Sequence, residues 1–222
     1  SNLAARKPVT SSVQDVVIGH LGMITDGGKG GRERADGVYI ADDGQYVEIG
    51  QGRQYVQVDL QENSVIDAVW IWHRHPYEGY EVPLDVVVQV ANDASFAAPA
   101  TMVFNSDADD SLGLGRGSDR RYATSRFGKL ILTAGALGRH VRLWFSGGTR
   151  TNNNTLVEVE VYGRTTALIR QQEADRSHAL RRERVWRWFL IIATAAISSI
   201  ALVILLRRAR ERKRGDSLVD ES

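Results

Sequence analysis

The chain has 222 residues, 28 basic and 27 acidic side chains, a formal net charge of +1 and no cysteine. The absence of cysteine excludes disulfide bonds and argues against a redox centre held by the chain itself. Charge is unevenly distributed, because residues 1–163 carry 15 basic and 20 acidic side chains, whereas residues 164–222 carry 13 and 7. The acidic part shows no basic face with interleaved aromatic residues, so nucleic acid is not an expected partner.

Short strand-like runs fill the first 163 residues. Each run alternates in polarity or is rich in β-branched and aromatic residues, and each is bounded by Gly, Asn, Asp or Pro clusters. Such runs, with no helical period before residue 165, predict an all-β domain with one core, built as an antiparallel sandwich or barrel. Spacing alone does not choose between these two. The runs cover residues 55–60, 65–72, 85–90, 101–104, 140–145 and 156–162.

An ordered set of segments within residues 2–163 resembles discoidin-type domains, also called coagulation factor five/eight type C domains. This resemblance implies an antiparallel jelly-roll β-sandwich of the galactose-binding-like class, and a module that binds sugars, lipids or proteins. Residues 28–54 depart from the family pattern, because Gly-rich charged sequence replaces a Trp-containing strand, so we expect different loops there. The matching segments are 2–12 (NLAARKPVTSS), 24–27 (ITDG), 55–60 (YVQVDL), 85–96, 103–115, 138–145 and 156–163 (LVEVEVYG).

The C-terminal part predicts helix and then a membrane span. Residues 164–187 contain a possible Thr cap and neither Gly nor Pro after it, which is typical of a helical stalk. Residues 188–206 (WFLIIATAAISSIALVILL) are uncharged and mostly apolar. As a helix they would reach about 28 Å, close to the ~30 Å hydrocarbon core of a bilayer. We therefore predict one transmembrane helix at 188–206 and a basic cytoplasmic tail at 207–222.

Orientation and location are expectations built on that span. Five basic residues precede it closely and six follow it, a difference too small to orient the chain. The chain begins with Ser1 and has no apolar run at its start; a removed signal peptide would explain this, and so would a different start of the chain. Together with the lack of cysteine, these features favour a bacterial inner membrane with the β-domain in the periplasm.

The span would bring its own partners. Thr194, Ala195, Ser198 and Ser199 form two small-x-x-x-small pairs, which allow close approach of another helix. Other integral membrane proteins are therefore expected partners, and the basic flanks suit anionic lipid headgroups.

No catalytic motif is present, and the chain is predicted not to be an enzyme. It lacks a Gly-x-Ser-x-Gly elbow, a His-Glu-x-x-His pair and a Walker loop. His73 and His75 have a spacing that can start a zinc site, but two loop histidines without a metal are the favoured interpretation.

A candidate ligand site follows from the resemblance. Discoidin-like sugar binders stack loop aromatic rings on sugars and bond hydroxyls with His, Arg and Asn. The cluster with that chemistry here is Trp72, His73, Arg74, Tyr77 and Tyr80. The alternative is that these aromatic residues pack a loop onto the sandwich or onto a partner protein.

Calcium is the metal that the resemblance implies. Several discoidin-like domains hold one structural Ca²⁺ between the early Asp-Gly turn and the first Glu of the closing strand, which correspond to Asp26 and Glu158. Backbone carbonyls near residues 28–31 would complete the oxygen shell that calcium requires. Two plain surface carboxylates are the alternative. A second oxygen-rich loop, interpreted as a solvated turn, contains Asn105, Asp107, Asp109 and Asp110.

Two functions remain open. The favoured hypothesis is a non-catalytic structural or docking subunit of a bacterial inner-membrane complex, such as an energy-converting, photosynthetic or respiratory one. The alternative is a membrane-anchored module that binds carbohydrate or another envelope polymer. In both cases a single domain with one span has no machinery of its own and must act on a partner.

Overall fold

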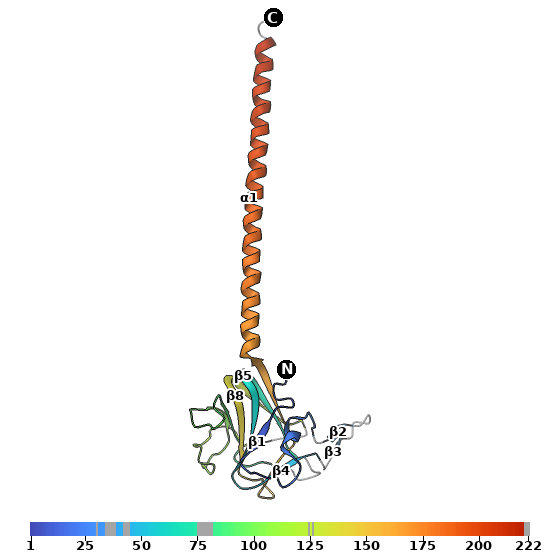
Figure 1. Cartoon of the computed structure of the whole chain (residues 1–222), viewed down its shortest axis with the longest axis vertical. Coiled ribbons are helices and arrows are strands. Elements are labelled where there is room, and N and C mark those ends of the chain that lie inside the picture. The colour runs from blue at the N-terminus through green and yellow to red at the C-terminus, as the bar shows by residue number, and fades with distance from the viewer. Residues whose placement is uncertain are drawn as a thin grey trace. The chain divides into compact units, whose positions relative to one another are not determined.

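The computed structural model describes residues 1–29, 31–33, 39–41, 45–74, 82–123, 125 and 127–219. The chain divides into two compact units, Ser1–Leu168 and Ile169–Ser222 (Figure 1). The first unit contains all the described strands and the second is helical, so each unit is treated separately.

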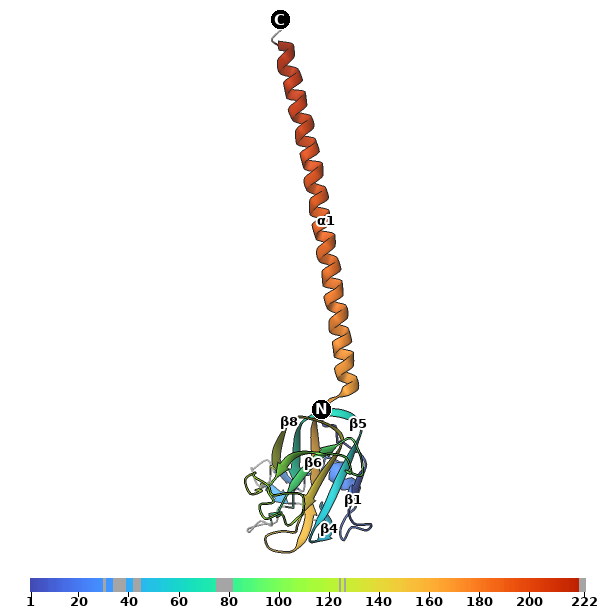
Figure 2. The same ribbon diagram turned by 90° about the vertical axis from the view of Figure 1, so that its left-hand side faces the viewer.

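The first unit is an antiparallel β-sandwich, as predicted. Its main sheet has six strands in the order β1-β5-β8-β6-β7, with β10 paired to β5 (Figure 2). Two smaller sheets pair β4 with β9 and β2 with β3, and a short 3₁₀ helix, η1, lies between β1 and β2. The bounds are β1 Val9–Ser11, η1 Leu21–Thr25, β2 Gly31–Glu33, β3 Tyr39–Ala41, β4 Val47–Gln51, β5 Gln54–Trp72, β6 Val87–Ala91, β7 Thr101–Asn105, β8 Lys129–Phe145, β9 Asn153–Leu156 and β10 Glu158–Thr165.

The two runs predicted at 55–60 and 65–72 form one long strand, β5. Its pairing with β8 shifts register between Asp59 and Ser64, where Gln61 has a φ of 68°. The irregularity lets the first half of β5 pair with β1 and the second half with β10. A single strand therefore links the early and the closing strands of the sandwich.

Strand periodicity explains the core. Successive side chains of a strand point to opposite faces. One face of β5, β6 and β8 enters the core, and parts of the other face, such as Val87 and Arg142, are buried as well. The inward set includes Val56, Val58, Val88, Val90, Val141 and Leu143.

Hydrogen bonds of the backbone and of the Asn2 side chain join the two ends of the sandwich domain. The amide of Leu3 donates to the carbonyl of Val161 at 2.7 Å, and the amide of Val161 donates to Asn2 Oδ1 at 3.0 Å. The amide of Arg6 donates to the carbonyl of Thr25 at 2.7 Å. These bonds bring the first residues of the chain against η1 and β10, where the expected calcium residues lie.

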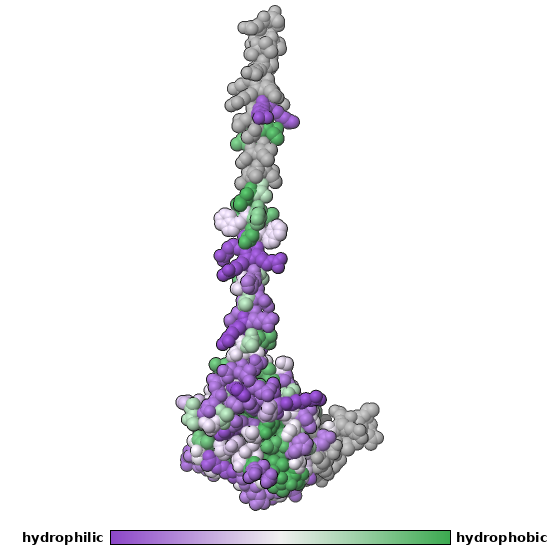
Figure 3. Space-filling model, viewed as in Figure 1, coloured by the Kyte–Doolittle hydropathy of each residue, from purple (hydrophilic) through white to green (hydrophobic). Residues whose placement is uncertain are grey.

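One continuous helix, α1, spans Thr166–Val219 and makes up the described part of the second unit. Thr165 Oγ1 accepts a hydrogen bond from the amide of Leu168 at 3.2 Å and so caps its first turn. The hydroxyl of Thr194 donates to the carbonyls of Leu190 and Ile191 at 3.0 and 2.9 Å. Figure 3 shows the apolar side chains of the described helix beyond a strongly hydrophilic segment. The side chains of Ala195, Ser198 and Ser199 lie outside the described residues.

The predicted transmembrane helix is not supported. Among the described residues, no helix contains a stretch that is both long and apolar enough to cross a membrane. The finding contradicts the predicted inner-membrane location, with its periplasmic domain and cytoplasmic tail, because that location depended on the span. The predicted partners, other membrane proteins and lipid headgroups, also depended on the span and are likewise unsupported.

Two leucines of β8 test the assignment of its faces. Leu143 is fully buried, whereas Leu132 is 74% exposed. Leu143→Ala should lower the free energy of unfolding by about 2–5 kcal/mol, because it leaves a cavity in the core. Leu132→Ala should change it by less than about 0.5 kcal/mol. Urea unfolding of the intact chain measures both values, and equal effects of the two substitutions would contradict the assignment.

Candidate functional site

The structure brings the expected calcium residues together. Glu158 opens β10 and is fully buried beneath the turn at Asp26. The amide of Gly27 donates to Glu158 Oε2 at 3.1 Å, and the amide of Gly28 donates to Asp26 Oδ1 at 2.7 Å. Gly27 has a φ of 94°, a conformation that favours glycine. The turn therefore folds over the Glu158 carboxyl group and covers it.

The second oxygen of Glu158 lacks a partner. Oε1 is buried and makes no hydrogen bond within the described structure, an arrangement that is costly unless a ligand satisfies the atom. Burial raises the pKa of Glu158 to about 8, and the nearby carboxylates of Asp26 and Glu160 add to the increase. Two carboxyl groups, one with an orphaned oxygen, are the donors that a calcium ion prefers. The residues present therefore fit a calcium ion, although Gly30 of the expected carbonyl segment lies outside the described residues.

Trp72 and His73 are interior residues. Trp72 is 4% exposed, its ring stacks on Trp70 at 4.9 Å, and the Lys29 ammonium lies 4.4 Å from its ring centre. His73 is 5% exposed and uses both ring nitrogens. Because a carbonyl only accepts, Nδ1 donates to Thr155 O at 2.8 Å, while Nε2 accepts from the Tyr122 hydroxyl at 2.9 Å.

Burial lowers the pKa of His73 to about 4, so its ring is neutral near pH 7. With the ring enclosed and both nitrogens bonded, the structure supports the packing alternative for His73 and Trp72 over contact with a sugar. Arg74 lies with its guanidinium 4.5 Å from the ring centre of Tyr46. Tyr77, Tyr80 and His75 lie outside the described residues.

A different aromatic cluster faces outward on the main sheet. Cross-strand pairing places Tyr55 opposite Trp144, and Gln57 opposite Arg142. Arg142 is in turn opposite Gln89 of β6. We call Arg53, Tyr55, Gln89, Phe96, Arg142 and Trp144 the Trp144 surface.

The Trp144 ring is held in one orientation. Its Nε1 donates to Gln89 Oε1 at 3.1 Å, and Tyr55 packs edge-on with ring centres 4.8 Å apart. The exposed Arg53 guanidinium lies 4.8 Å from the indole centre. Trp144 is therefore a fixed, partly exposed aromatic platform flanked by planar polar groups.

Arg142 anchors this surface from within the sheet. Its guanidinium donates from Nε and Nη2 to Gln57 Oε1 at 2.9 and 2.6 Å, and from Nη2 to the carbonyl of Ala94 at 3.1 Å. The Phe96 ring centre lies 3.9 Å from it. These contacts tie the loop after β6 to the outer face of the sheet.

Sequence reasoning missed Trp144 as a binding candidate, although a signal was present. In residues 138–145 (GRHVRLWF) a two-residue period places His140, Arg142 and Trp144 on one face. Periodicity does not reveal the partners of that face, because Tyr55 and Gln89 come from distant strands.

The oxygen-rich loop is braced internally. Oxygens of Asp85, Asp107 and Asp109 lie within 4.8 Å of one another. Burial by itself would raise the pKa of Asp107, but hydrogen bonds from the amides of Leu112 and Ser111 outweigh it and lower the pKa. Asp85 Oδ2 accepts from the Ser111 hydroxyl at 3.0 Å and from the Ser146 hydroxyl at 2.5 Å. These bonds account for the cluster as a loop brace.

Comparison with known proteins identifies the fold. No protein-family model and no curated protein matches the chain. The lectin domain of lectinolysin, solved with Lewis B antigen, is 16% identical, with a TM-score of 0.50 over 74% of this chain and 98% of that one. A fucose binding module from Streptococcus pneumoniae, SpX-3, is 17% identical, with a TM-score of 0.50 over 74% and 99%. Chitosan-binding module 1 from a Paenibacillus sp. IK-5 chitosanase/glucanase is 18% identical, with a TM-score of 0.48 over 73% and 99%.

At such low identity the likeness shows the fold alone. The first unit has the galactose-binding-like β-sandwich fold seen in the lectin domain and the fucose binding module.

Glu158 should make the stability of the metal-free protein depend on pH. Its pKa is about 8 in the folded state against an ordinary value of 4.5, so the folded state retains a proton that the unfolded state releases between these values. Stability should therefore fall as pH rises through this window, with a slope of up to about 1.4 kcal/mol per pH unit.

Glu158→Gln should remove this dependence, because glutamine stays neutral. Urea unfolding with a chelator at about pH 5 and about pH 8 measures the difference, and the exposed Glu62→Gln is the matched control. A wild type and a Glu158→Gln variant with parallel pH profiles would contradict the buried, protonated carboxyl group.

Proposed function

We propose that the first unit is a non-catalytic, discoidin-like carbohydrate-binding module that recognises glycans on the Trp144 surface. The observation that carries the proposal is the fixed, partly exposed indole of Trp144 between Arg53, Tyr55 and Gln89. The shared fold with a Lewis B-binding lectin domain and a fucose binding module supports the same class of ligand.

The chemistry of this surface suits a sugar ring. A pyranose presents an apolar C–H face that packs on an aromatic ring, and hydroxyls that need planar donors and acceptors at the ring edge. Trp144 supplies the flat apolar face. Gln89 and the exposed Arg53, whose guanidinium lies 4.8 Å from the indole centre, supply the polar groups at the edge of the ring.

The docking-subunit hypothesis has less support. It needed a spanning helix to hold the protein among membrane proteins, and no described helix could span a membrane. The alternative, a carbohydrate-binding module, loses its expected membrane anchor for the same reason, but recognition of a glycan by the sandwich does not depend on that anchor.

We further propose a structural calcium ion between Asp26 and Glu158. The orphaned, buried Glu158 Oε1 supports it, because a cation would satisfy that atom and replace its proton. The ion would tie the turn after η1 to the first residue of β10. Its role would be to stabilise the sandwich rather than to take part in a reaction.

Glycan binding by the intact chain tests the main proposal. Arrayed neutral glycans, followed by calorimetry on the best ligand, should show binding that Trp144→Ala weakens at least about tenfold. Arg53→Ala, which removes only an exposed side chain, should weaken it as well, while the exposed Arg120→Ala should not. Circular dichroism of each variant separates lost binding from lost folding. Retention on no glycan, or unchanged binding by both variants, would refute the proposal.

Calcium addition tests the metal proposal. At [Ca²⁺] about 100 times its Kd, a bound ion should stabilise the chain by about 2.7 kcal/mol. Thermal melting with calcium and with a chelator measures the shift, and Glu158→Gln should abolish it. Asp109→Asn, in the braced acidic loop, is the control that should leave the shift unchanged. Identical wild-type melting in both conditions would exclude the ion.

A further inference from the structure

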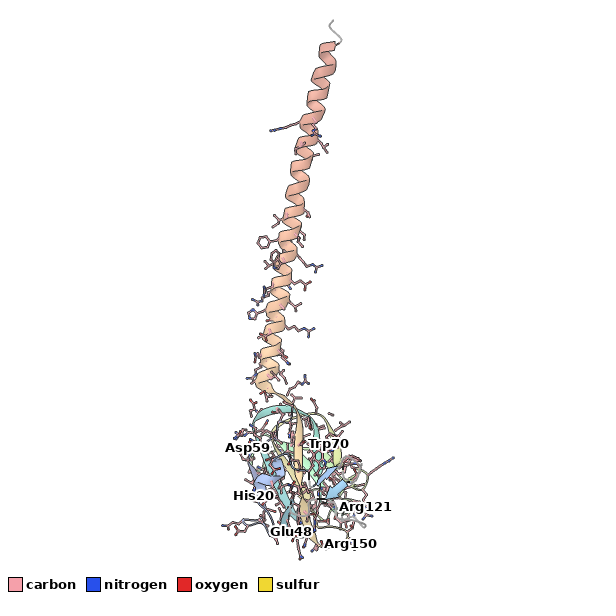
Figure 4. The ribbon with its side chains drawn as sticks, turned by 90° about the vertical axis from the view of Figure 1, so that its right-hand side faces the viewer. His20, Glu48, Asp59, Trp70, Arg121 and Arg150 are labelled. Atoms are coloured by element: carbon pink, nitrogen blue, oxygen red, sulfur yellow. The ribbon has the colours of Figure 1, made fainter. Side chains whose placement is uncertain are left out.

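A cavity of about 480 Å³ lies beside the Asp26 turn, apart from the residues of the Trp144 surface. Its volume falls within the range of small-ligand pockets, about 300–1,000 Å³. Among the described residues, seven line it, and one of them, His20, is labelled in Figure 4. They are Arg6, His20, Met23, Asp26, Gly28, Gln45 and Val157.

Local backbone structure brings these side chains together from distant parts of the sequence. The amide of Arg6 bonds to Thr25 at the end of η1, which places Arg6 beside the Asp26 turn. His20 is the residue before η1, and Gln45 precedes β4. Gly28 leaves room between them, since an added Cβ would lie 3.0 Å from Asp26 Oδ1 and 3.2 Å from Gln45 Oε1.

Within the described residues, three polar side chains of the cavity have no hydrogen-bond partner. In the described part of the chain, the side chains of Arg6, His20 and Gln45 make no hydrogen bond or ion pair. Arg6 and Asp26 line the same cavity and yet form no ion pair with each other. A cation and an anion thus stand apart in one cavity, and the guanidinium is open to a ligand.

The separation of Arg6 from Asp26 indicates which chemical groups a ligand of this cavity would carry. A guanidinium binds a carboxylate through two parallel charge-assisted hydrogen bonds. Asp26 would repel a second carboxylate but accepts hydroxyl hydrogens, and the Gln45 amide can both donate and accept. Met23 and Val157 add apolar surface. The best fit is a small molecule with one carboxylate at one end and several hydroxyls at the other.

We propose that this cavity is a second binding site, one that takes a carboxylate-bearing sugar such as a hexuronate. Arg6 pairs with its carboxylate, and Asp26 and Gln45 bond its hydroxyls. The inference extends the proposed carbohydrate-binding function to an acidic sugar, but the site shares no residue with the Trp144 surface, so each can fail alone.

The test uses the intact 222-residue chain and calorimetric titration with sodium glucuronate in the presence of a chelator. Glucose, which has the hydroxyls alone, and acetate, which has the carboxylate alone, are the reference probes. Glucuronate should bind at least about tenfold more tightly than either, because only it engages both ends of the cavity. The chelator removes any contribution from a metal ion at the Asp26 turn.

Matched variants assign the site. Arg6→Gln should weaken glucuronate binding at least about tenfold, and Gln45→Ala should weaken it as well. The exposed Arg121→Gln is the charge-matched control and should leave it unchanged. Arg6 and Gln45 are exposed residues, so we expect the two variants to fold.

The outcomes separate the two binding proposals. Trp144→Ala should leave glucuronate binding intact, and Arg6→Gln should leave neutral-glycan binding intact. Glucuronate binding that is absent, no tighter than that of glucose or acetate, or insensitive to Arg6→Gln overturns the second site, whatever the neutral glycans do. Arg6-dependent glucuronate binding without any neutral-glycan binding would support this cavity and refute the Trp144 surface.

Discussion

The antiparallel pairing of β5 with β8 is the constraint on which the rest of the first unit depends. Tyr55 lies opposite Trp144 near one end of the pair, and Ile71 lies opposite Lys129 near the other. Because side chains alternate along each strand, this register decides at once which residues enter the core and which form the outer face. A slip of one residue would exchange Leu143 and Trp144, and with them the core and the proposed glycan surface.

The outer face shows how a binding surface can be built on rigid elements. Arg142 is enclosed by Gln57, Phe96 and Tyr55, and its bonds to Gln57 and Ala94 hold a loop against the sheet. Removal of a charge from water is costly unless it is paired or hydrogen-bonded, and this network provides the compensation. Contacts with Gln89 and Tyr55 on the same face hold the indole of Trp144 in one orientation. Little conformational entropy is therefore lost when a ligand packs on it.

Two acidic residues of the closing strand, β10, lie against residues from the start of the chain. Glu158 is buried with one oxygen unbonded, while two residues later Glu160 pairs with Lys29 at 3.1 Å and accepts from the Tyr162 hydroxyl at 2.6 Å. Lys29 also lies over Trp72, whose ring packs against Trp70 and is shielded from solvent. The segment after the Asp-Gly turn therefore covers both the carboxyl group proposed for calcium and the tryptophan first expected to meet a sugar.

Local pattern was sufficient for β5, β6, β7, β10, the end of β8 and the C-terminal helix, because two-residue periodicity, turn residues and the lack of Gly and Pro in residues 166–187 act within a few residues. It did not predict β1 to β4, most of β9 or the first part of β8. The structure also places the Asp26 turn against Glu158, the two residues that the resemblance named for calcium. Burial of Trp72 and His73 escaped such reasoning, since it depends on Lys29, Tyr122 and Thr155, which reach them from distant strands and loops. The apolar run at 188–206 was likewise over-interpreted as a span. Which face of a strand is covered, and which groups meet at a cavity, are properties of long-range pairing, and only the folded chain decides them.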